Sequence, residues 1–172
     1  MSRLKPCVDA LYEGVGRVAD NIPGLPTCEV LLLRLLLLNG EALLRDIEDK
    51  LKPVDMNESD LRTLMMLYSS ADGTSTPSEL CTLAEQKPTN MTRITTMLVK
   101  RGLISRSHAT HDRRQVVLTI TAEGRRFVRK LLPPMFPDLK DRFACFSDSE
   151  RKTFERLLKK LALHIDPVPP TP

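Results

Sequence analysis

Residues 98–127 read LVKRGLISRSHATHDRRQVVLTITAEGRRF, and this stretch decides the fold. A helical pattern leads into it and stops at Gly102, because glycine commonly ends helices. The apolar spacing then changes to every second residue over 103–107 and again over 115–121, which predicts two strands. The polar segment 108–114 between them ends in two arginines. We therefore expect a β-hairpin directly after a helix, the arrangement called a wing.

The segment before this hairpin predicts two short helices. Residues 76–79 read TPSE, in which Thr76 suits the N-cap, proline the first helical position and Glu79 the closing position of a capping box. We expect this helix to run to about Glu85, and Pro88 to open a second helix that extends to Arg101. Two short helices joined by two residues indicate a helix-turn-helix.

The second of these helices has two different faces. At about 100° per residue, the apolar residues Met91, Ile94 and Leu98 fall on one side. The opposite side holds three threonines and two cations, namely Thr89, Thr92, Arg93, Thr96 and Lys100. Such a face suits the DNA major groove, where arginine bonds guanine edges and threonine contacts a thymine methyl group or a phosphate. The alternative is a plain amphipathic surface helix, but residues 86–101 lack the acidic side chains that solvated faces usually carry.

Charge is unevenly distributed along the chain. Residues 87–130 hold eleven basic and two acidic residues, a charge of +9, which leaves −5 on the remainder of a chain whose total is +4. A basic middle between acidic flanks is typical of proteins that bind a polyanion, because neutralised phosphates release their counterions. An ordinary solvated basic face would have the same charge. The wing favours DNA, since its tip can place a cation in the narrow minor groove.

Long helices are expected on both sides of this region. Apolar residues recur at near-heptad spacing over 1–20 and form a stripe that needs a partner to bury it. After a turn rich in Pro and Gly at 21–26, Thr27 can cap a leucine-rich helix that runs to about Lys50. Asn57 or Ser59 then begins a helix that ends near residue 70.

A polar loop is expected over 71–75, ahead of the helix-turn-helix. Beyond the wing, Thr121 can cap a further helix, which three prolines at 133, 134 and 137 must kink or break. Residues 147–150 read SDSE, a second capping box, and they begin a last amphipathic helix. The final segment, 167–172, is expected to be disordered.

Composition excludes several classes of protein. The chain has 172 residues with 41% hydrophobic and 28% charged residues, 7 glycines and no tryptophan, which favours helices over an all-β sandwich. The longest apolar run, 30–38, is interrupted by Arg34 and is too short to span a bilayer. The N-terminus lacks the apolar core of a secretory signal, so we expect a cytoplasmic protein without a membrane partner.

Neither a metal site nor an enzyme is indicated. The four cysteines, at 7, 28, 81 and 145, form no CxxC pair, so we expect thiols that are mostly buried and no zinc site or disulfide framework. No HExxH, GxSxG or phosphate-binding glycine loop occurs. We expect no cofactor and no catalytic residues.

The order of elements and several motifs closely resemble the MarR family of winged-helix transcription factors. The motifs are the LxxRGLI string that begins at Leu98, the DRR of residues 112–114, and the LT to Gly124 segment that enters the next helix. The resemblance covers roughly residues 28–165. The TNMTRI string at 89–94 and the LLPP string at 131–134 are most similar to the EmrR (MprA) subgroup, which represses multidrug-efflux genes.

The resemblance implies a fold that is mostly α with a small β wing, in which N- and C-terminal dimerisation helices flank a winged helix-turn-helix domain. We divide the chain into an N-terminal arm and turn (1–26), a long dimerisation and core helix (27–56), the winged region (57–121), C-terminal dimerisation helices (122–166) and the tail (167–172). It also implies a homodimer that binds a pseudo-palindromic operator in double-stranded DNA, more commonly as a repressor.

The family's DNA contacts can be carried over to this sequence. By analogy, Asp112 orients the wing and Arg114 enters the minor groove, while residues of the second helix contact the major groove or its phosphates. The complete set of expected DNA-binding residues is Thr89, Asn90, Thr92, Arg93, Thr96, Lys100, Asp112, Arg113 and Arg114.

Family members commonly bind a small aromatic or anionic effector between the dimerisation helices and the winged domain. The resemblance suggests a lining that includes Arg34, Met65, Met66 and Tyr68. For each residue, a role as a core methionine or an interface arginine is at least as good an interpretation.

Two rival hypotheses remain open. Some family members release DNA when an N-terminal cysteine is oxidised, and Cys28 at a helix start is the redox candidate here, although the acidic Glu29 beside it works against a reactive thiolate. The other rival is a winged-helix module that binds proteins and no DNA. The acid-free helix face and the paired arginines of the wing argue against it.

Overall fold

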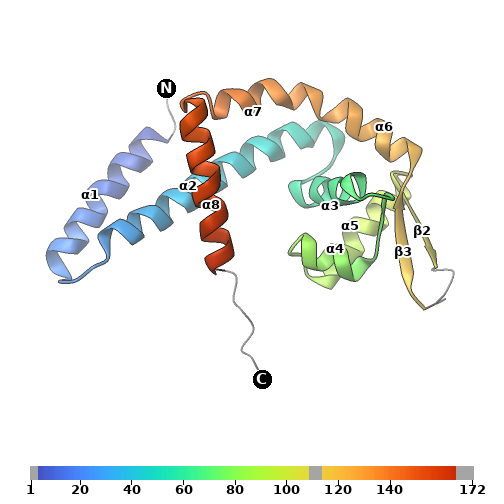
Figure 1. The fold of residues 1–172 in the computed structure, drawn as a ribbon, viewed down its shortest axis with the longest axis horizontal. Coiled ribbons are helices and arrows are strands. Elements are labelled where there is room, and N and C mark those ends of the chain that lie inside the picture. The colour runs from blue at the N-terminus through green and yellow to red at the C-terminus, as the bar shows by residue number, and fades with distance from the viewer. Residues whose placement is uncertain (1–3, 109–113, 166–172) are drawn as a thin grey trace.

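The computed structural model describes residues 4–108 and 114–165, and it is mostly helical with one small sheet (Figure 1). Two long N-terminal helices lead into a winged helix-turn-helix region, and further helices lead away from it. In chain order the elements are α1 (Lys5–Asn21), α2 (Thr27–Leu51), η1 (Lys52–Val54), α3 (Glu58–Ser69), β1 (Thr74–Ser75), α4 (Pro77–Leu83), α5 (Pro88–Lys100), β2 (Ile104–His108), β3 (Val116–Ile120), α6 (Ala122–Leu131), η2 (Pro133–Met135), α7 (Phe136–Arg142) and α8 (Asp148–Ile165).

The sheet has three antiparallel strands in the order β1-β3-β2. The predicted hairpin is confirmed, with Ile104 opposite Ile120 and Arg106 opposite Leu118. Strand β1, which pairs Thr74 with Thr119, lies in the segment that we expected to be a loop. Two residues are too few to show an alternating pattern, so only the pairing with β3 defines this strand.

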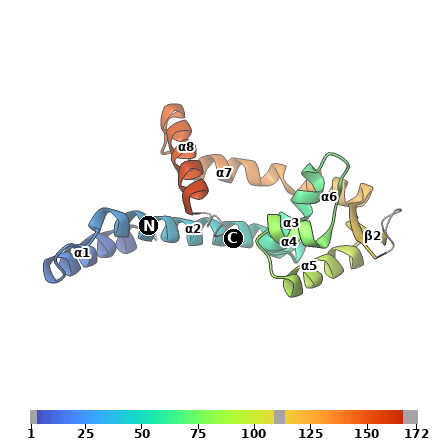
Figure 2. The ribbon, with the colours of Figure 1, turned by 60° about the horizontal axis from the view of Figure 1, so that its bottom comes forward.

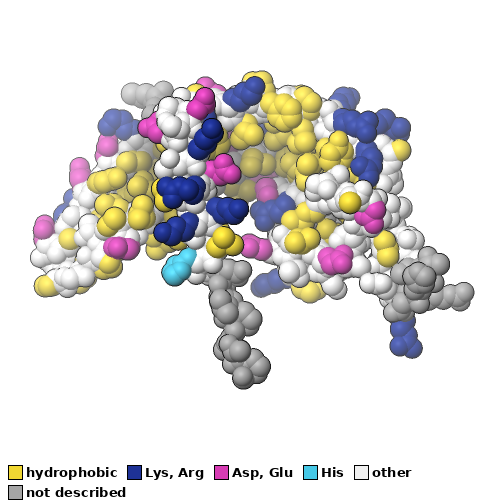
Figure 3. All heavy atoms as spheres, in the orientation of Figure 1, with side chains coloured by type: hydrophobic (Ala, Val, Ile, Leu, Met, Phe, Trp, Pro, Cys, Tyr) yellow, Lys and Arg dark blue, Asp and Glu magenta, His cyan; other side chains and the backbone are white. Residues whose placement is uncertain are grey.

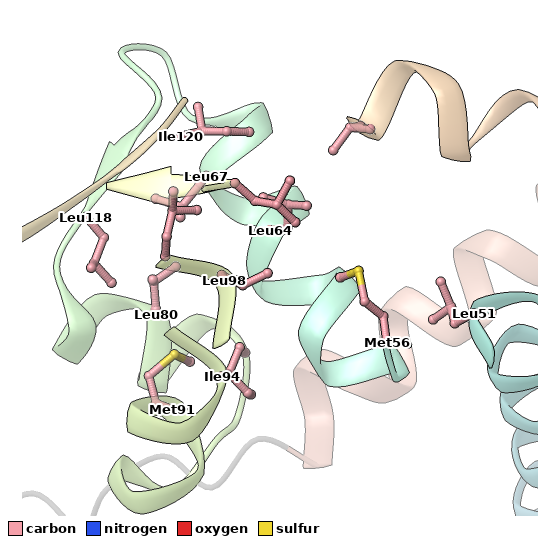
Figure 4. Close-up of a cluster of buried hydrophobic side chains, with 14 residues drawn as sticks. Leu51, Met56, Leu64, Leu67, Leu80, Met91, Ile94, Leu98, Leu118 and Ile120 are labelled. Carbon is pink, nitrogen blue, oxygen red and sulfur yellow. The ribbon is translucent and has the colours of Figure 1, made fainter. Parts of the chain in front are cut away.

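The main cluster of buried side chains lies between Leu51 and Val128, where helices α3 to α6 pack against the sheet (Figure 4). Four leucines from three helices, at positions 64, 67, 80 and 98, have no exposed surface. Leu118 and Ile120 extend the same cluster from β3. Met91, Ile94 and Leu98 are buried, which confirms the predicted inner face of the second helix of the helix-turn-helix.

Side-chain caps fix the starts of three helices around this core, α3, α4 and α6, whereas α5 begins without one. The predicted capping box between Thr76 and Glu79 is present, and a second box joins Asn57 to Asp60 at the start of α3. Thr121 caps α6 by accepting a hydrogen bond from the N–H of Gly124 at 2.9 Å. The expected cap at Thr27 is wrong, because Thr27 is already helical and its hydroxyl donates to the carbonyl of Leu25.

Gly124 allows the start of α6 to lie against the backbone of Leu103, just after the end of α5. A Cβ atom at this position would lie 2.1 Å from the carbonyl oxygen of Leu103, so the backbones approach too closely for any other residue. The same carbonyl accepts hydrogen bonds from the N–H and the hydroxyl of Thr121, both at 3.0 Å. These contacts fix α6 relative to the wing.

The long helices extend away from the core (Figures 1 and 2). Helices α1 and α2 form an antiparallel hairpin, in which only Val15 of α1 is buried. As predicted, the proline-containing segment after α6 breaks that helix, which gives way to η2 and α7. Among the described helices, none combines the length and the apolar character needed to span a bilayer.

Candidate nucleic-acid interface

Helix α5 presents the predicted polar face to solvent. Thr89, Thr92, Thr96 and Lys100 are exposed, whereas the opposite residues lie in the core. The helix therefore rests on the protein through its apolar side and offers hydroxyl groups and a cation on the other. Exposed hydroxyl groups and a cation on one helix face are the chemistry that suits contacts in a major groove.

The preceding helix and turn hold α5 in position. The Thr76 backbone N–H and the Ser75 hydroxyl donate to the Glu79 carboxylate, and these hydrogen bonds hold the pKa of Glu79 below its ordinary value. The turn after α4 passes through Glu85, which adopts a left-handed conformation with φ of 51°. The N–H of Gln86 then donates to the carbonyl of Cys81 at 2.9 Å, which closes the turn.

Arg93 and Asn90, both predicted DNA-binding residues, bond to other side chains of the protein. Arg93 donates from Nη2 to Oδ1 of Asp60 at 3.1 Å and from Nε to Oδ1 of Asn90 at 3.0 Å. Asn90 donates from Nδ2 to Oε1 of Gln86 at 2.5 Å. Helical periodicity places Arg93 and Asn90 near the outer face, but it does not identify these partners.

The wing extends beside α5. Its strand β2 is buried at Ile104 and exposed over the next four residues, and Arg114 is exposed where the description resumes before β3. The predicted contacts Asp112 and Arg113 lie outside the described residues. Of the two arginines predicted at the end of the wing loop, Arg114 is therefore the one described, two residues before β3 begins.

Arg106 is a candidate DNA-contacting residue that our sequence reasoning missed. It is exposed on β2, and its register opposite Leu118 puts it on the side of the hairpin that faces the helices. Arg106 and Thr92 both line a groove of about 340 Å³ between the helix-turn-helix and the wing. Two signals together could have identified Arg106, namely the alternating apolar pattern of residues 103–107 and the pairing register of the two strands.

The four predicted effector residues lie on two helices, three on α3 and one on α2. Met65, Met66 and Tyr68 are half-buried on α3 and pack against the core, with the Arg125 guanidinium 5.9 Å from the centre of the Tyr68 ring. Arg34 is exposed on α2, 17 residues before the helix ends at Leu51. At 1.5 Å per residue, Arg34 is about 25 Å along the helix axis from that end.

A cavity of about 1010 Å³ lies between α2 and the segment that joins α7 to α8, and its lining includes none of these four residues. Its walls are mainly apolar, with Leu32, Leu36, Phe146 and Phe154 among them. In Figure 3 this region is the apolar hollow below α7, and apolar side chains also gather over the α1–α2 hairpin.

The cysteines differ from our expectation. Cys7, Cys28 and Cys145 are exposed and only Cys81 is half-buried, because three of the four lie on or beside helices that extend away from the core. Cys28 is the second residue of α2, so the redox hypothesis remains a prediction. Within residues 4–108 and 114–165, no three His, Cys, Asp or Glu side chains form a group that could hold a metal ion.

Comparison with known proteins defines the class of this fold and site. A sequence model of the MarR family matches residues 56–116. The chain is 34% identical over 141 residues to the transcriptional repressor MprA of Escherichia coli K12, covering 82% of this chain and 80% of MprA. It is 29% identical over 160 residues to the transcriptional regulator PrsX of Escherichia coli, covering 93% and 96% of the two chains.

Solved structures have the same architecture. A mutant MarR from Escherichia coli complexed with operator DNA matches with a TM-score of 0.68 at 25% identity, covering 76% of this chain and 92% of that one. Sco3205, a MarR-family regulator from Streptomyces coelicolor in complex with DNA, matches with a TM-score of 0.73 at 20% identity, covering 86% and 94%.

The chain belongs to the MarR family of transcriptional regulators. The predicted fold class is confirmed, and the similarity to MprA agrees with the subgroup that the sequence motifs indicated. The family and these relatives consist of regulators, which confirms the prediction that the chain is not an enzyme.

Proposed function

We propose that this chain is a homodimeric repressor that binds a pseudo-palindromic operator and releases it when a small aromatic or anionic effector binds. The observation that carries the proposal is the exposed, acid-free face of α5 beside the arginines of the wing. Thr89, Thr92, Thr96 and Lys100 would lie in the major groove, and Arg114 would reach the minor groove. The relatives that bind operator DNA or repress transcription support this assignment.

Exposed apolar side chains on the long helices support the homodimer. Leu32, Leu33 and Leu37 on α2 are at least half exposed, and α8 presents Phe154, Leu157, Leu158 and Leu161 to solvent. Soluble monomers rarely leave such contiguous apolar surface open. A second copy would cover it, and two recognition helices related by a two-fold axis would then read two half-sites.

The experiment that tests DNA recognition is selection from a pool of random DNA duplexes with the purified protein at near-physiological salt. We expect enrichment of an inverted repeat whose half-sites lie about one helical turn apart. Salt-sensitive binding with no enriched sequence would contradict sequence-specific recognition and would favour the protein-interaction module.

Release by an effector is tested on the selected operator. Small aromatic carboxylates such as benzoate are expected to lower the affinity for the operator without dissociating the dimer. The competing redox mechanism rests on the exposed Cys28 at the start of α2. If peroxide releases the wild-type protein but not the Cys28→Ser variant, oxidation rather than an effector controls binding.

A further inference from the structure

The start of α3 and the first half of α5 are joined by a closed ring of polar side chains. Asp60 accepts from Arg93, Arg93 donates to Asn90, and Asn90 donates to Gln86. Gln86 donates from Nε2 to Oγ of Ser59 at 3.3 Å, and Ser59 directly precedes Asp60. The ring therefore links two neighbouring residues of α3 to α5 and to the turn before α5.

Asp60 is the buried member of this ring, so water cannot readily take the place of its hydrogen-bond partners. Its side chain is only 4% exposed, whereas that of Arg93 is 50% exposed. The Oδ2 atom of Asp60 accepts from the N–H of Asn57 at 3.0 Å as part of the capping box of α3. The Oδ1 atom has Arg93 as its side-chain partner, so loss of the guanidinium would leave a buried carboxylate without its countercharge.

Arg93 uses its planar geometry to join both sides of the ring. Nε points to Asn90 on its own helix and Nη2 points to Asp60 on α3. Guanidinium groups can hold two such acceptors at fixed angles, which an ammonium group cannot do. The two N–H groups that make these hydrogen bonds are thereby used within the protein and are not offered to a base edge.

We infer that Arg93 is a positioning residue that fixes the recognition helix α5 against α3 through Asp60, and that base selection belongs to other residues of the exposed face. This inference rests on the proposed function, because it assigns a role within the DNA-binding site. It separates Arg93 from Thr92, Thr96 and Lys100, which share its helix and are exposed but take no part in the ring.

The test measures affinity and base preference for four proteins: wild type, Arg93→Ala, Asp60→Asn and the double variant. A positioning role predicts that each single change lowers affinity for the selected operator roughly tenfold and that the double variant loses little more than either one, because contacting residues are not additive. The ranking of operator variants, substituted one base pair at a time, should stay the same for all four proteins.

Lys100→Ala is the matched control. It removes one cation from the exposed face of the same helix, at a residue without a place in the ring. Combined with Asp60→Asn, its loss of affinity should be additive, in contrast to that of Arg93→Ala. Non-additivity of the Lys100 pair equal to that of the Arg93 pair would overturn the specific link between Arg93 and Asp60.

If Arg93→Ala does not fold properly, as judged by loss of cooperative unfolding, a second pair of substitutions without charge still tests the inference. The combination Asp60→Asn with Arg93→Gln replaces the ion pair by two amides and should bind the operator better than Arg93→Gln alone. A changed base preference for Arg93→Gln, with no recovery in the double variant, would make Arg93 a base-reading residue. Failure of the wild-type protein to select any sequence would contradict the proposed function instead.

Discussion

The winged region and the long helices differ in what they bury. Every fully buried large side chain lies between Leu51 and Val128, whereas no described residue of α8 is buried and α1 buries only Val15. Capping does not follow this division, since α3, α4 and α6 begin with side-chain caps but α5 does not. Among the long helices, α1 and α2 lack such a cap, whereas Ser147 and Glu150 form the predicted capping box at the start of α8. One region is complete within a single chain, and the other requires further apolar surface to cover it.

Charge and chemistry follow the same division. The winged region supplies the polar, acid-free face of α5 and the wing, while the long helices supply exposed leucines and phenylalanines. The proposed DNA binding and the proposed self-association would therefore use separate surfaces. Substitutions in one region should leave the function of the other intact.

The largest effect is expected from a cavity in the winged core. Leu64→Ala removes a side chain with no exposed surface and should lower the free energy of unfolding by about 2–5 kcal/mol. Leu163→Ala makes the same chemical change on α8, where the side chain is 71% exposed and lies away from the proposed dimer face, and should cost far less. Urea unfolding of both variants at one protein concentration checks the difference, and equal losses would show that the two regions do not differ in this way.

The next effect is on self-association. At 100° per residue, Leu157 and Leu161 share one face of α8, whereas Leu163 lies on the opposite face. Leu157→Asp should weaken the dimer at least tenfold, because a charge replaces apolar surface at the proposed interface. Sedimentation equilibrium measures the dissociation constant.

Leu163→Asp is the control for that experiment, since it introduces the same charge at a side chain that is 71% exposed. It should leave the dimer nearly unchanged. If the two variants dissociate equally, the apolar face of α8 is not the interface.

Local sequence signals predicted most of the winged region. Capping residues act on backbone groups within three positions of themselves, so Thr76 and Thr121 could be read directly from the sequence. Strand β1 escaped prediction because two residues have no periodicity. Its position depends on hydrogen bonds to β3, more than 40 residues away in the chain.

The candidate site was predicted less completely than the fold. Helical spacing correctly placed Thr89, Thr92 and Lys100 on the outer face. It could not show that Arg93 meets a carboxylate 33 positions earlier, since that contact depends on how α3 packs against α5. The exposed cysteines were missed for a similar reason, because burial depends on packing that the sequence alone does not specify.

A smaller effect is expected from a substitution in the wing, which should change the affinity for DNA and not the dimer. Arg114→Ala should weaken operator binding by about 1–3 kcal/mol, as expected for loss of a cation from the minor groove, without changing the dimer. Lys152→Ala removes one exposed cation from α8 and serves as the control. Fluorescence anisotropy with labelled operator measures both, and wild-type affinity for Arg114→Ala would refute the assignment of the wing.

The smallest effect is expected at the turn of the helix-turn-helix. Glu85 has a φ of 51°, a left-handed conformation that costs a residue with a side chain about 1–2 kcal/mol. Glu85→Gly removes that strain but gives the unfolded chain more freedom, so we expect a net gain in stability of about 0.5–1 kcal/mol. Asp55, with a φ of 50°, offers a comparison in the same chain, because aspartate tolerates this conformation better and Asp55→Gly should be nearly neutral.

Thermal unfolding of the two glycine variants decides between strain and a compensating role of the Glu85 side chain. A gain for Glu85→Gly with unchanged self-association would place the strain within the winged region, independent of the long helices. A loss of stability would mean that the exposed carboxylate contributes more than the turn conformation costs. The turn would then be held by the charge of Glu85, which lies between helix α4 and the recognition helix.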